Sequence, residues 1–215
     1  MYISLLCCTA NSLSTTLISL TFASMQTGLF FGSFNPIHIG HMILANYMIS
    51  VAGMKEVWFV VSPQNPHKEK QNLLDETQRL QMVRRVVENE PKMKASAIEF
   101  DLPRPSFTVN TLAHLSEKYP ERNFALILGA DNLETFHKWK NYEAILENHF
   151  LYVYPRPGYT GGALAQHPHV KFVAAPQIEI SSTFLRQCVK EKKEIRWFMP
   201  EAAWNYMREM HFYEK

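Results

Sequence analysis

Two histidines lie three residues apart in a loop that is rich in glycine and proline. The stretch GSFNPIHIGH, residues 32–41, follows the apolar run TGLFF and contains His38 and His41. Imidazoles can donate hydrogen bonds to phosphate oxygens, and a protonated imidazole also supplies charge. Gly32 and Gly40 allow the backbone to approach a ligand closely, and a helix that opens within the motif would direct unpaired amide groups at an anion. The pattern favours a phosphate-binding loop over a turn with two solvated histidines.

A second group of hydrogen-bond donors lies near the other end of the chain, in EISSTFLR, residues 179–186. Ser181 or Ser182 can cap a new helix. The hydroxyls of Ser182 and Thr183 would then share a face with the guanidinium of Arg186, a forked donor suited to phosphate. By itself this motif fits an ordinary serine-capped helix with a surface arginine, so its weight comes from its combination with the first loop.

Strand-like and helical runs alternate along the chain and must position these loops. Apolar runs predict strands, and apolar residues at helical spacing between capping signals predict helices. We expect strands at 27–32, 56–62, 94–100, 123–130, 149–156 and 170–175, and helices at 41–53, 75–90, 108–119, 182–194 and 200–210. This order predicts an α/β fold, a doubly wound parallel sheet of Rossmann-like type. Such sheets bind ligands at the carboxyl ends of their strands, so we expect both loops on one rim.

The composition narrows the class of function. The 215 residues carry a net charge of +2 and no long basic block, which argues against nucleic acid as a partner and favours a small anionic substrate. Cys7, Cys8 and Cys188 have neither the spacing of a disulfide framework nor that of a metal site. We therefore expect reduced thiols in a cytoplasmic protein. Zinc on the two histidines would need a third ligand, and none is spaced to supply it, so we expect no metal ligands.

The first 24 residues differ from the rest, since they are rich in Ser, Thr and Leu and contain no charged side chain. They lack the positive start of a signal peptide and the unbroken apolar run of ~20 residues that a membrane helix needs. We expect residues 1–24 to be an atypical N-terminal extension outside the fold, with Met25 as the natural initiator and no membrane partner. An unusual export signal is the alternative, and a homo-oligomer stays open.

Several further segments turn the two end motifs into a family pattern. The chain contains SPQNPHK, SFTVNTL, GADNLETFHKWKNYEAIL and PRPGY, and it ends in PEAAWNYMREMHFYEK. Together with GSFNPIHIGH and ISSTFLR, these segments resemble the bacterial-type nicotinate-nucleotide adenylyltransferase family, within the nucleotidyltransferase superfamily of the HxGH motif. The resemblance covers about residues 25–214, so 25–215 is expected to form one nucleotidyltransferase domain. Asn35 and Asn110 depart from the pattern, because Asp is common at both positions.

The resemblance implies adenylyl transfer from ATP to nicotinate mononucleotide, giving the dinucleotide and pyrophosphate in NAD biosynthesis, with Mg²⁺ carried by the ATP phosphates. It implies His41, His38 and Arg186 as catalytic residues. Residues implied to bind ATP are Gly32, Ser33, Phe34, His38, His41, Gly129, Asp131, Ser182, Thr183 and Arg186. Residues implied to bind the acceptor are Asn35, Lys68, Thr108 and Trp139. From the residues alone, Asp131 could equally cap a helix, and Trp139 would be plain packing.

Three other functions were compared with this pattern. The letters HIGH and the segment KMKAS, residues 92–96, also suggest class I aminoacyl-tRNA synthetases. That segment runs into a predicted strand in mid-domain, and the chain has no room for a tRNA-binding domain, so we reject this function. A related enzyme with nicotinamide mononucleotide or phosphopantetheine as acceptor is disfavoured by SFTVNTL and Trp139. A non-catalytic nucleotide-binding regulator is expected to have lost His41 or Arg186, and both are present.

A chain that begins at Met25 should fold as well as the full-length chain and keep the implied activity, because the family pattern is complete after that residue. Thermal unfolding and pyrophosphate release of the two proteins, measured side by side, check this prediction. A shortened protein that fails to fold would place residues 1–24 within the domain.

Overall fold

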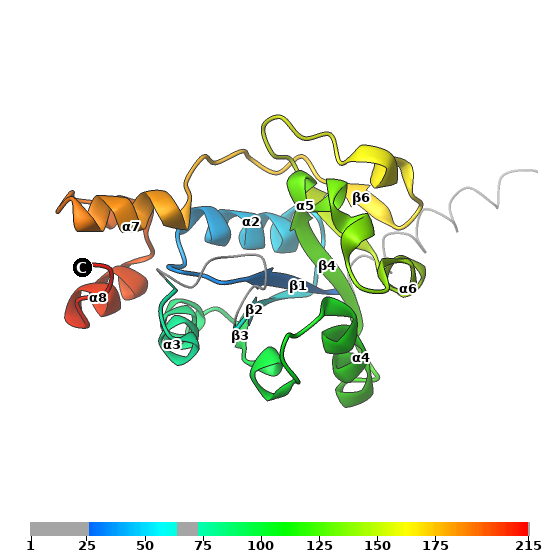
Figure 1. The fold of residues 1–215 in the computed structure, drawn as a ribbon, viewed down its shortest axis with the longest axis horizontal. Coiled ribbons are helices and arrows are strands. Elements are labelled where there is room, and N and C mark those ends of the chain that lie inside the picture. Colours follow the sequence, from blue (N-terminus) through cyan, green and yellow to red (C-terminus); the bar gives the residue numbers. More distant parts are fainter. Residues whose placement is uncertain (1–25, 64–72, 215) are drawn as a thin grey trace, which may run out of the picture.

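Six parallel strands form one sheet in the order β3-β2-β1-β4-β5-β6 (Figure 1). The computed structural model describes residues 26–63 and 73–214. The strands are β1 (Gln26–Gly32), β2 (Glu56–Val61), β3 (Met93–Ser96), β4 (Asn123–Gly129), β5 (Leu151–Tyr154) and β6 (Val170–Phe172). The predicted α/β class with a parallel sheet is therefore confirmed.

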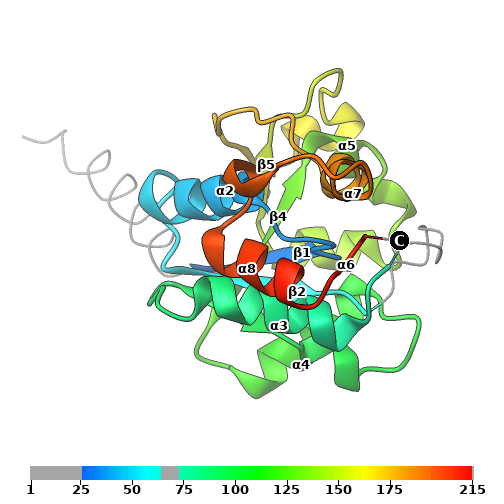
Figure 2. The same cartoon turned by 90° about the vertical axis from the view of Figure 1, so that its left-hand side faces the viewer.

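Helices cover both faces of this sheet. The α-helices are α2 (Ile39–Ser50), α3 (Glu76–Val87), α4 (Thr108–Lys118), α5 (Ala130–Glu134), α6 (Tyr142–Asn148), α7 (Ser182–Lys190) and α8 (Glu201–Glu209). Short 3₁₀ turns are η2 (Ile98–Asp101), η3 (Phe136–Lys138), η4 (Gly162–Gln166) and η5 (Arg196–Phe198). Figure 1 shows α7 and α8 together at one end of the molecule, and Figure 2 views that end face on.

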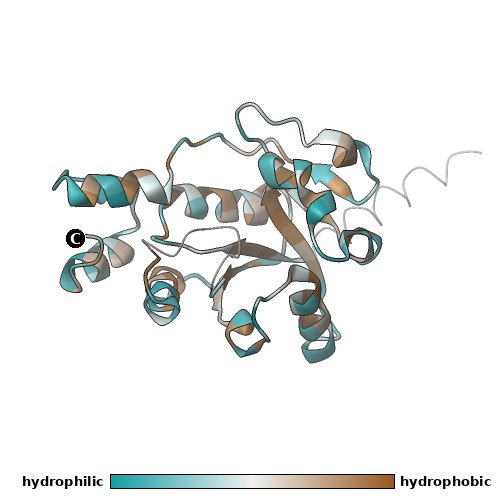
Figure 3. Cartoon of the chain, in the orientation of Figure 1, coloured by the Kyte–Doolittle hydropathy of each residue, from teal (hydrophilic) through white to brown (hydrophobic). Residues whose placement is uncertain are grey.

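Alternate residues of each central strand enter two separate hydrophobic cores. In β1, Phe30 joins the core that contains residues of α2, α3, α7 and α8, whereas Leu29 joins the core beneath α4, α5 and α6. In β2, Phe59 and Trp58 divide in the same way. Because side chains of a strand alternate between faces, a sheet covered on both sides needs strands that are apolar throughout. Figure 3 shows this as a hydrophobic sheet between helices whose outer surfaces are hydrophilic.

The structure differs from the sequence prediction at the third strand. The predicted strand 94–100 pairs only as far as Ser96, and Ile98–Asp101 then turns into η2. The turn buries Glu99, whose Oε1 accepts a hydrogen bond from the Thr111 hydroxyl at 3.0 Å. A buried carboxylate must be hydrogen-bonded, and α4 supplies the partner. Asp75 caps α3 as expected, accepting from the Thr77 amide.

The strand order reverses between β1 and β4, because the chain winds from β1 outward to β3 and then returns to β4 beside β1. Loops that leave the carboxyl ends of these two strands diverge to opposite faces and leave a crevice between them. The GSFNPIHIGH loop follows β1, and the segment GAD follows β4. The topology thus places both segments at the position where α/β sheets bind ligands. Within the described residues, no helix is long and apolar enough to cross a membrane.

A fully buried arginine ties the loop after β1 to the neighbouring connections. The guanidinium of Arg79, on α3 and 0% exposed, donates hydrogen bonds of 2.6–2.8 Å to four main-chain carbonyls. The acceptors are the carbonyls of Ser33, Ser62, Pro63 and Leu74. Arginine is the side chain with enough donors to satisfy several carbonyls at once. Arg79 therefore joins the first loop to the end of β2 and to the segment that leads into α3.

Replacing Arg79 by methionine should lower the free energy of unfolding by at least ~3 kcal/mol, because it leaves several buried carbonyls without donors. The matched control is Arg84→Met on the same helix, where Arg84 is exposed; a surface change of this kind is expected to cost within ~0.5 kcal/mol. Urea unfolding of both variants is the measurement. Equal losses would refute a structural role for the Arg79 hydrogen bonds.

Candidate active site

The first loop turns sharply before α2 and presents the start of that helix to the crevice. Phe34 adopts a left-handed backbone with a φ of 44°, and its ring fills the space where a side chain at Gly32 would lie, at 2.9 Å. His38 is the N-cap of α2, and a Cβ at Gly40 would meet the His38 ring at 3.1 Å. A side chain at Gly32 would thus displace the buried Phe34 ring, and one at Gly40 would press on the His38 ring. The predicted helix start within the motif is confirmed.

The two histidines stack against each other. Their ring centroids are 3.7 Å apart with the planes tilted by 30°. The His38 amide donates to Nδ1 of His41 at 3.2 Å. Because Nδ1 accepts, a neutral His41 carries its proton on Nε2, which makes Nε2 the donor of that ring. The fold therefore fixes both the orientation and the tautomer of His41.

His38 is a neutral side chain in this environment. It is 6% exposed, and burial, followed by the positive charge of Arg156, lowers its pKa to about 4. Its Nδ1 atom is buried without a hydrogen-bond partner in the described structure. The idea that a protonated imidazole supplies charge to the loop therefore does not hold for His38 near pH 7. It can donate one hydrogen bond, and the positive charge must come from other residues.

The second motif docks onto the first through two side chains. The Ser182 hydroxyl donates to the Pro36 carbonyl at 2.9 Å, and Nη1 of Arg186 donates to the Asn35 carbonyl at 2.8 Å. Nη2 of Arg186 is 3.3 Å from the Thr183 hydroxyl. The N-cap of α7 is Ser181, which accepts from the Phe184 amide. The two motifs, more than 140 residues apart in sequence, therefore lie on one rim, as expected.

The turn after β4 adds a carboxylate and a cation to this rim. Oδ1 of Asp131 lies 3.7 Å from Nε of Arg156. Gly129 is the N-cap of α5, so Asp131 is not the cap that its position could also have suggested. A side chain at Gly129 would displace the Asp131 carboxylate and crowd the Arg156 side chain. Arg156 also contributes to the low pKa of His38, which places its charge next to the histidine pair.

Sequence reasoning gave no role to Arg156, Arg79 or Glu99. Arg156 follows the apolar strand β5 within PRPGY, so the rule that ligand-binding residues follow parallel strands could have identified it. The donor role of Arg79 depends on carbonyls from three separate segments and left no signal in the sequence. Burial raises the pKa of Glu99, which lies among the hydroxyls of Ser62, Ser106 and Thr111.

The residues expected to bind the acceptor are more scattered. Thr108 is the first residue of α4, whose N-cap Phe107 offers no side-chain hydrogen bond. Trp139 is half-buried, with its ring 4.8 Å from that of Phe136, and it packs against the core beneath α4–α6. No described contact joins Thr108 or Trp139 to the histidine pair. Lys68 lies outside the described residues.

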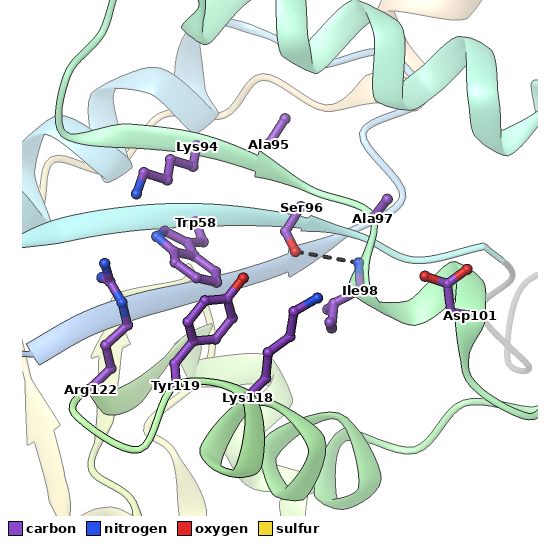
Figure 4. A pocket seen from close by; sticks show the side chains of 10 residues that line it. All are labelled: Trp58, Lys94, Ala95, Ser96, Ala97, Ile98, Asp101, Lys118, Tyr119 and Arg122. Carbon is purple, nitrogen blue, oxygen red and sulfur yellow. Dashed lines mark hydrogen bonds between the residues drawn. The ribbon is translucent and has the colours of Figure 1, made fainter.

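A separate pocket of about 330 Å³ lies between β3 and the end of α4 (Figure 4). Its cationic side chains include Lys94 and Arg122, and both form ion pairs with Glu56. Trp58 and Tyr119 form its apolar wall. Glu56 thus offsets part of the positive charge of Lys94 and Arg122, and Lys118 and Asp101 also line the pocket. None of the residues predicted to bind ATP or acceptor lines it.

The described residues contain no cluster of three or more His, Cys, Asp or Glu side chains that could hold a metal ion. The rim instead combines the two imidazoles, two guanidiniums, helix N-termini and one carboxylate. That set suits a polyphosphate with a polar sugar, because guanidiniums and helix N-termini bind phosphate oxygens and a carboxylate accepts from hydroxyls. It contains no apparent nucleophile paired with a base.

Comparison with known proteins agrees with this chemistry. Residues 29–188 match the family described as cytidylyltransferase-like. A protein of Christiangramia forsetii, named "Probable nicotinate-nucleotide adenylyltransferase", is 54% identical over 88% of this chain and 98% of its own length. A protein of Flavobacterium johnsoniae with the same name is 52% identical over 89% of this chain and its full length.

Solved structures share the fold at low sequence identity. The nicotinic acid mononucleotide adenylyltransferase of Plasmodium falciparum, described as a complex with NaAD, superposes with a TM-score of 0.73 at 18% identity. The match covers 88% of this chain and 97% of that one. A second structure of the same enzyme, complexed with APC, gives a TM-score of 0.72 at 17% identity. With the rim chemistry, the family match and relatives at more than half identity all in agreement, the chain belongs to the nicotinate-nucleotide adenylyltransferase family.

Proposed function

We propose that the rim formed by the first loop, α7 and the turn after β4 catalyses adenylyl transfer from ATP to nicotinate mononucleotide. The observation that carries this proposal is the stacked pair His38–His41 at the start of α2, with Arg186 of α7 hydrogen-bonded to the same loop. A pyrophosphate-release assay with a panel of acceptors tests it. The acceptors are nicotinate mononucleotide, nicotinamide mononucleotide and phosphopantetheine, and the first should be used best.

The reaction joins two phosphates without a covalent enzyme intermediate. An oxygen of the mononucleotide phosphate forms a bond to the α-phosphorus of ATP, while the bond from that phosphorus to the pyrophosphate oxygen breaks. Pyrophosphate leaves with the electron pair of the broken bond. A phosphate is already ionised and nucleophilic at neutral pH, so no strong base is needed. Catalysis then consists of positioning and charge stabilisation, which a rim of donors can supply.

The donors divide this task by position. Nε2–H of His41 would donate to an oxygen of the α-phosphate, and His38 would hold the phosphates as a neutral donor. Arg186, with Ser182 and Thr183, would bind the β- and γ-phosphates, since its guanidinium brings a permanent charge. Because Arg186 and Ser182 also bind loop carbonyls, they hold the first loop and the phosphates in one arrangement.

The remaining residues would hold the sugar, the base and the acceptor. Asp131 would accept hydrogen bonds from the ATP ribose hydroxyls, and Gly32, Ser33, Phe34 and Gly129 would let the nucleotide approach the backbone. Thr108, Lys68, Trp139 and Asn35 would bind the acceptor, although Oδ1 of Asn35 already accepts from the Leu74 amide and the Tyr213 hydroxyl. Mg²⁺ would enter on the ATP phosphates, which fits a described structure without a metal-ligand cluster.

His41→Ala should lower kcat by ~10²-fold or more, as loss of one transition-state donor does in other enzymes. His41 is partly exposed at the rim, so the fold should be retained. Steady-state pyrophosphate release, with circular dichroism to confirm folding, is the measurement, and His114→Ala on α4 is the control. Near-normal turnover of the His41 variant would remove it from the mechanism.

The acid acceptor should be preferred over its amide. A carboxylate only accepts hydrogen bonds, so the Thr108 hydroxyl and the amide groups at the start of α4 suit it, whereas the amide would present NH₂ to donors. Such a mismatch is worth ~10²–10⁴-fold in kcat/KM. Thr108→Val should narrow the gap between the two mononucleotides, while Trp139→Ala should raise KM for both alike. A preference for the amide would overturn this substrate choice.

A further inference from the structure

The C-terminal segment returns to the first loop through one tyrosine. The Tyr213 hydroxyl donates to Oδ1 of Asn35 at 2.7 Å, and the Leu74 amide donates to the same oxygen at 3.2 Å. Asn35 is buried between Phe34 and the loop proline. Its side-chain carbonyl thus joins three segments of the chain: the first loop, the residue before α3 and the segment after α8.

The phenol of Tyr213 is held as a neutral donor. Burial raises its pKa, and the charges of Arg186 and Arg79 oppose that rise, so both guanidiniums lie within electrostatic reach of its oxygen. These are the two arginines that bind carbonyls of the first loop, at Asn35 and Ser33. Tyr213 therefore adds a further donor to a loop that the two arginines and Ser182 already bind.

The backbone on both sides of this contact is strained. Phe34, directly before Asn35, has a φ of 44°, and Tyr213 itself has a φ of 66°. A left-handed conformation is unfavourable for a residue other than glycine. Strain of this kind persists where surrounding contacts over-determine the conformation, and it clusters at functional sites. The Tyr213–Asn35 hydrogen bond joins the strained Tyr213 to the residue next to the strained Phe34, and it is a contact of this kind.

We propose that Tyr213 is a positioning residue for the phosphate-binding loop, acting through Asn35. This proposal rests on the proposed function, because the loop that Tyr213 holds carries the His38–His41 pair. The Asn35 carbonyl of the same loop accepts a hydrogen bond from Arg186. The Tyr213 hydroxyl fixes the Asn35 side chain, and the Asn35 main chain fixes Arg186. Loss of the Tyr213 hydroxyl leaves the fold intact but increases the mobility of the loop that binds the α-phosphate.

The test compares two variants that each lose one phenolic oxygen. Tyr213→Phe removes the donor to Asn35, whereas Tyr206→Phe removes the donor from α8 to Gln78 on α3, away from the loop. We expect kcat/KM for ATP to fall about tenfold in Tyr213→Phe, the effect of one hydrogen bond, and to change less than about twofold in the control. Hydrogen–deuterium exchange of the amides of residues 32–41 should rise only in Tyr213→Phe.

A double-mutant cycle with Asn35 distinguishes an effect of Tyr213 through Asn35 from a general effect of the segment after α8. Tyr213→Phe should cost nothing further in an Asn35→Ala background, because the acceptor of its hydrogen bond is then already absent. If Tyr213→Phe matches Tyr206→Phe in either kinetics or exchange, the proposal is overturned. If the wild-type protein releases no pyrophosphate with any acceptor, the proposed function fails, and exchange alone then decides whether Tyr213 positions the loop.

Discussion

The hydrogen bonds of Arg79 are the constraint on which the catalytic rim depends. A guanidinium that is removed from water normally pairs with a carboxylate, because an isolated buried charge is costly. Here the nearest partners are instead the carbonyls of Ser33, Ser62, Pro63 and Leu74. The Asp75 and Glu76 carboxylates act on this guanidinium at longer range, and no ion pair among the described residues joins either of them to it. The hydrogen bonds of Arg79 thus go to the main chain of the loop and its neighbours rather than to a carboxylate.

The rim separates hydrogen bonding from charge. Burial keeps His38 neutral, and the tautomer of His41 is set by a backbone amide, so the histidines contribute directed N–H groups. Permanent charge comes from Arg156, in the loop that follows β5, and from Arg186 in α7. Because a guanidinium stays protonated at any physiological pH and burial lowers the pKa of His38 to about 4, the charge of His38 and the two arginines should vary little around neutrality.

Sequence patterns identified what depends on local chemistry and missed what depends on distant contacts. The strands were predictable because a sheet covered on both faces needs continuous apolar runs such as NFALILG. The placement of both motifs on one rim followed from the rule for parallel sheets. The family resemblance is confirmed by the relatives. The third strand was predicted too long, because apolar Ile98 and Phe100 continue the strand pattern while Glu99 needs the partners that a turn supplies.

Hydrogen-bond partners that are distant in sequence explain two further differences from what the sequence indicated. Gln78 stands three residues after the N-cap Asp75, which is the spacing of a capping box, yet its Oε1 accepts from the Tyr206 hydroxyl, which lies 128 residues away in sequence. The family resemblance implied that Asn35 binds the acceptor, and the structure shows that its Oδ1 accepts hydrogen bonds from the Leu74 amide and the Tyr213 hydroxyl. Neither partner can be read from local spacing, because each donor comes from a different element.

The direction of the loop carbonyls shows why so many donors gather beneath it. In a trans peptide the carbonyl of one residue and the amide of the next point in opposite directions. The Ser33 carbonyl faces Arg79 and the Pro36 carbonyl faces Ser182, so the amides of Phe34 and Ile37 point away from those anchors. Donors that bind the carbonyls thus leave N–H groups on the opposite side of the loop, and an array of such groups is what an anion needs. The buried arginine, the serine on α7 and the histidine pair therefore act together: the first two orient the backbone, and that orientation sets the loop surface on which the histidine pair lies.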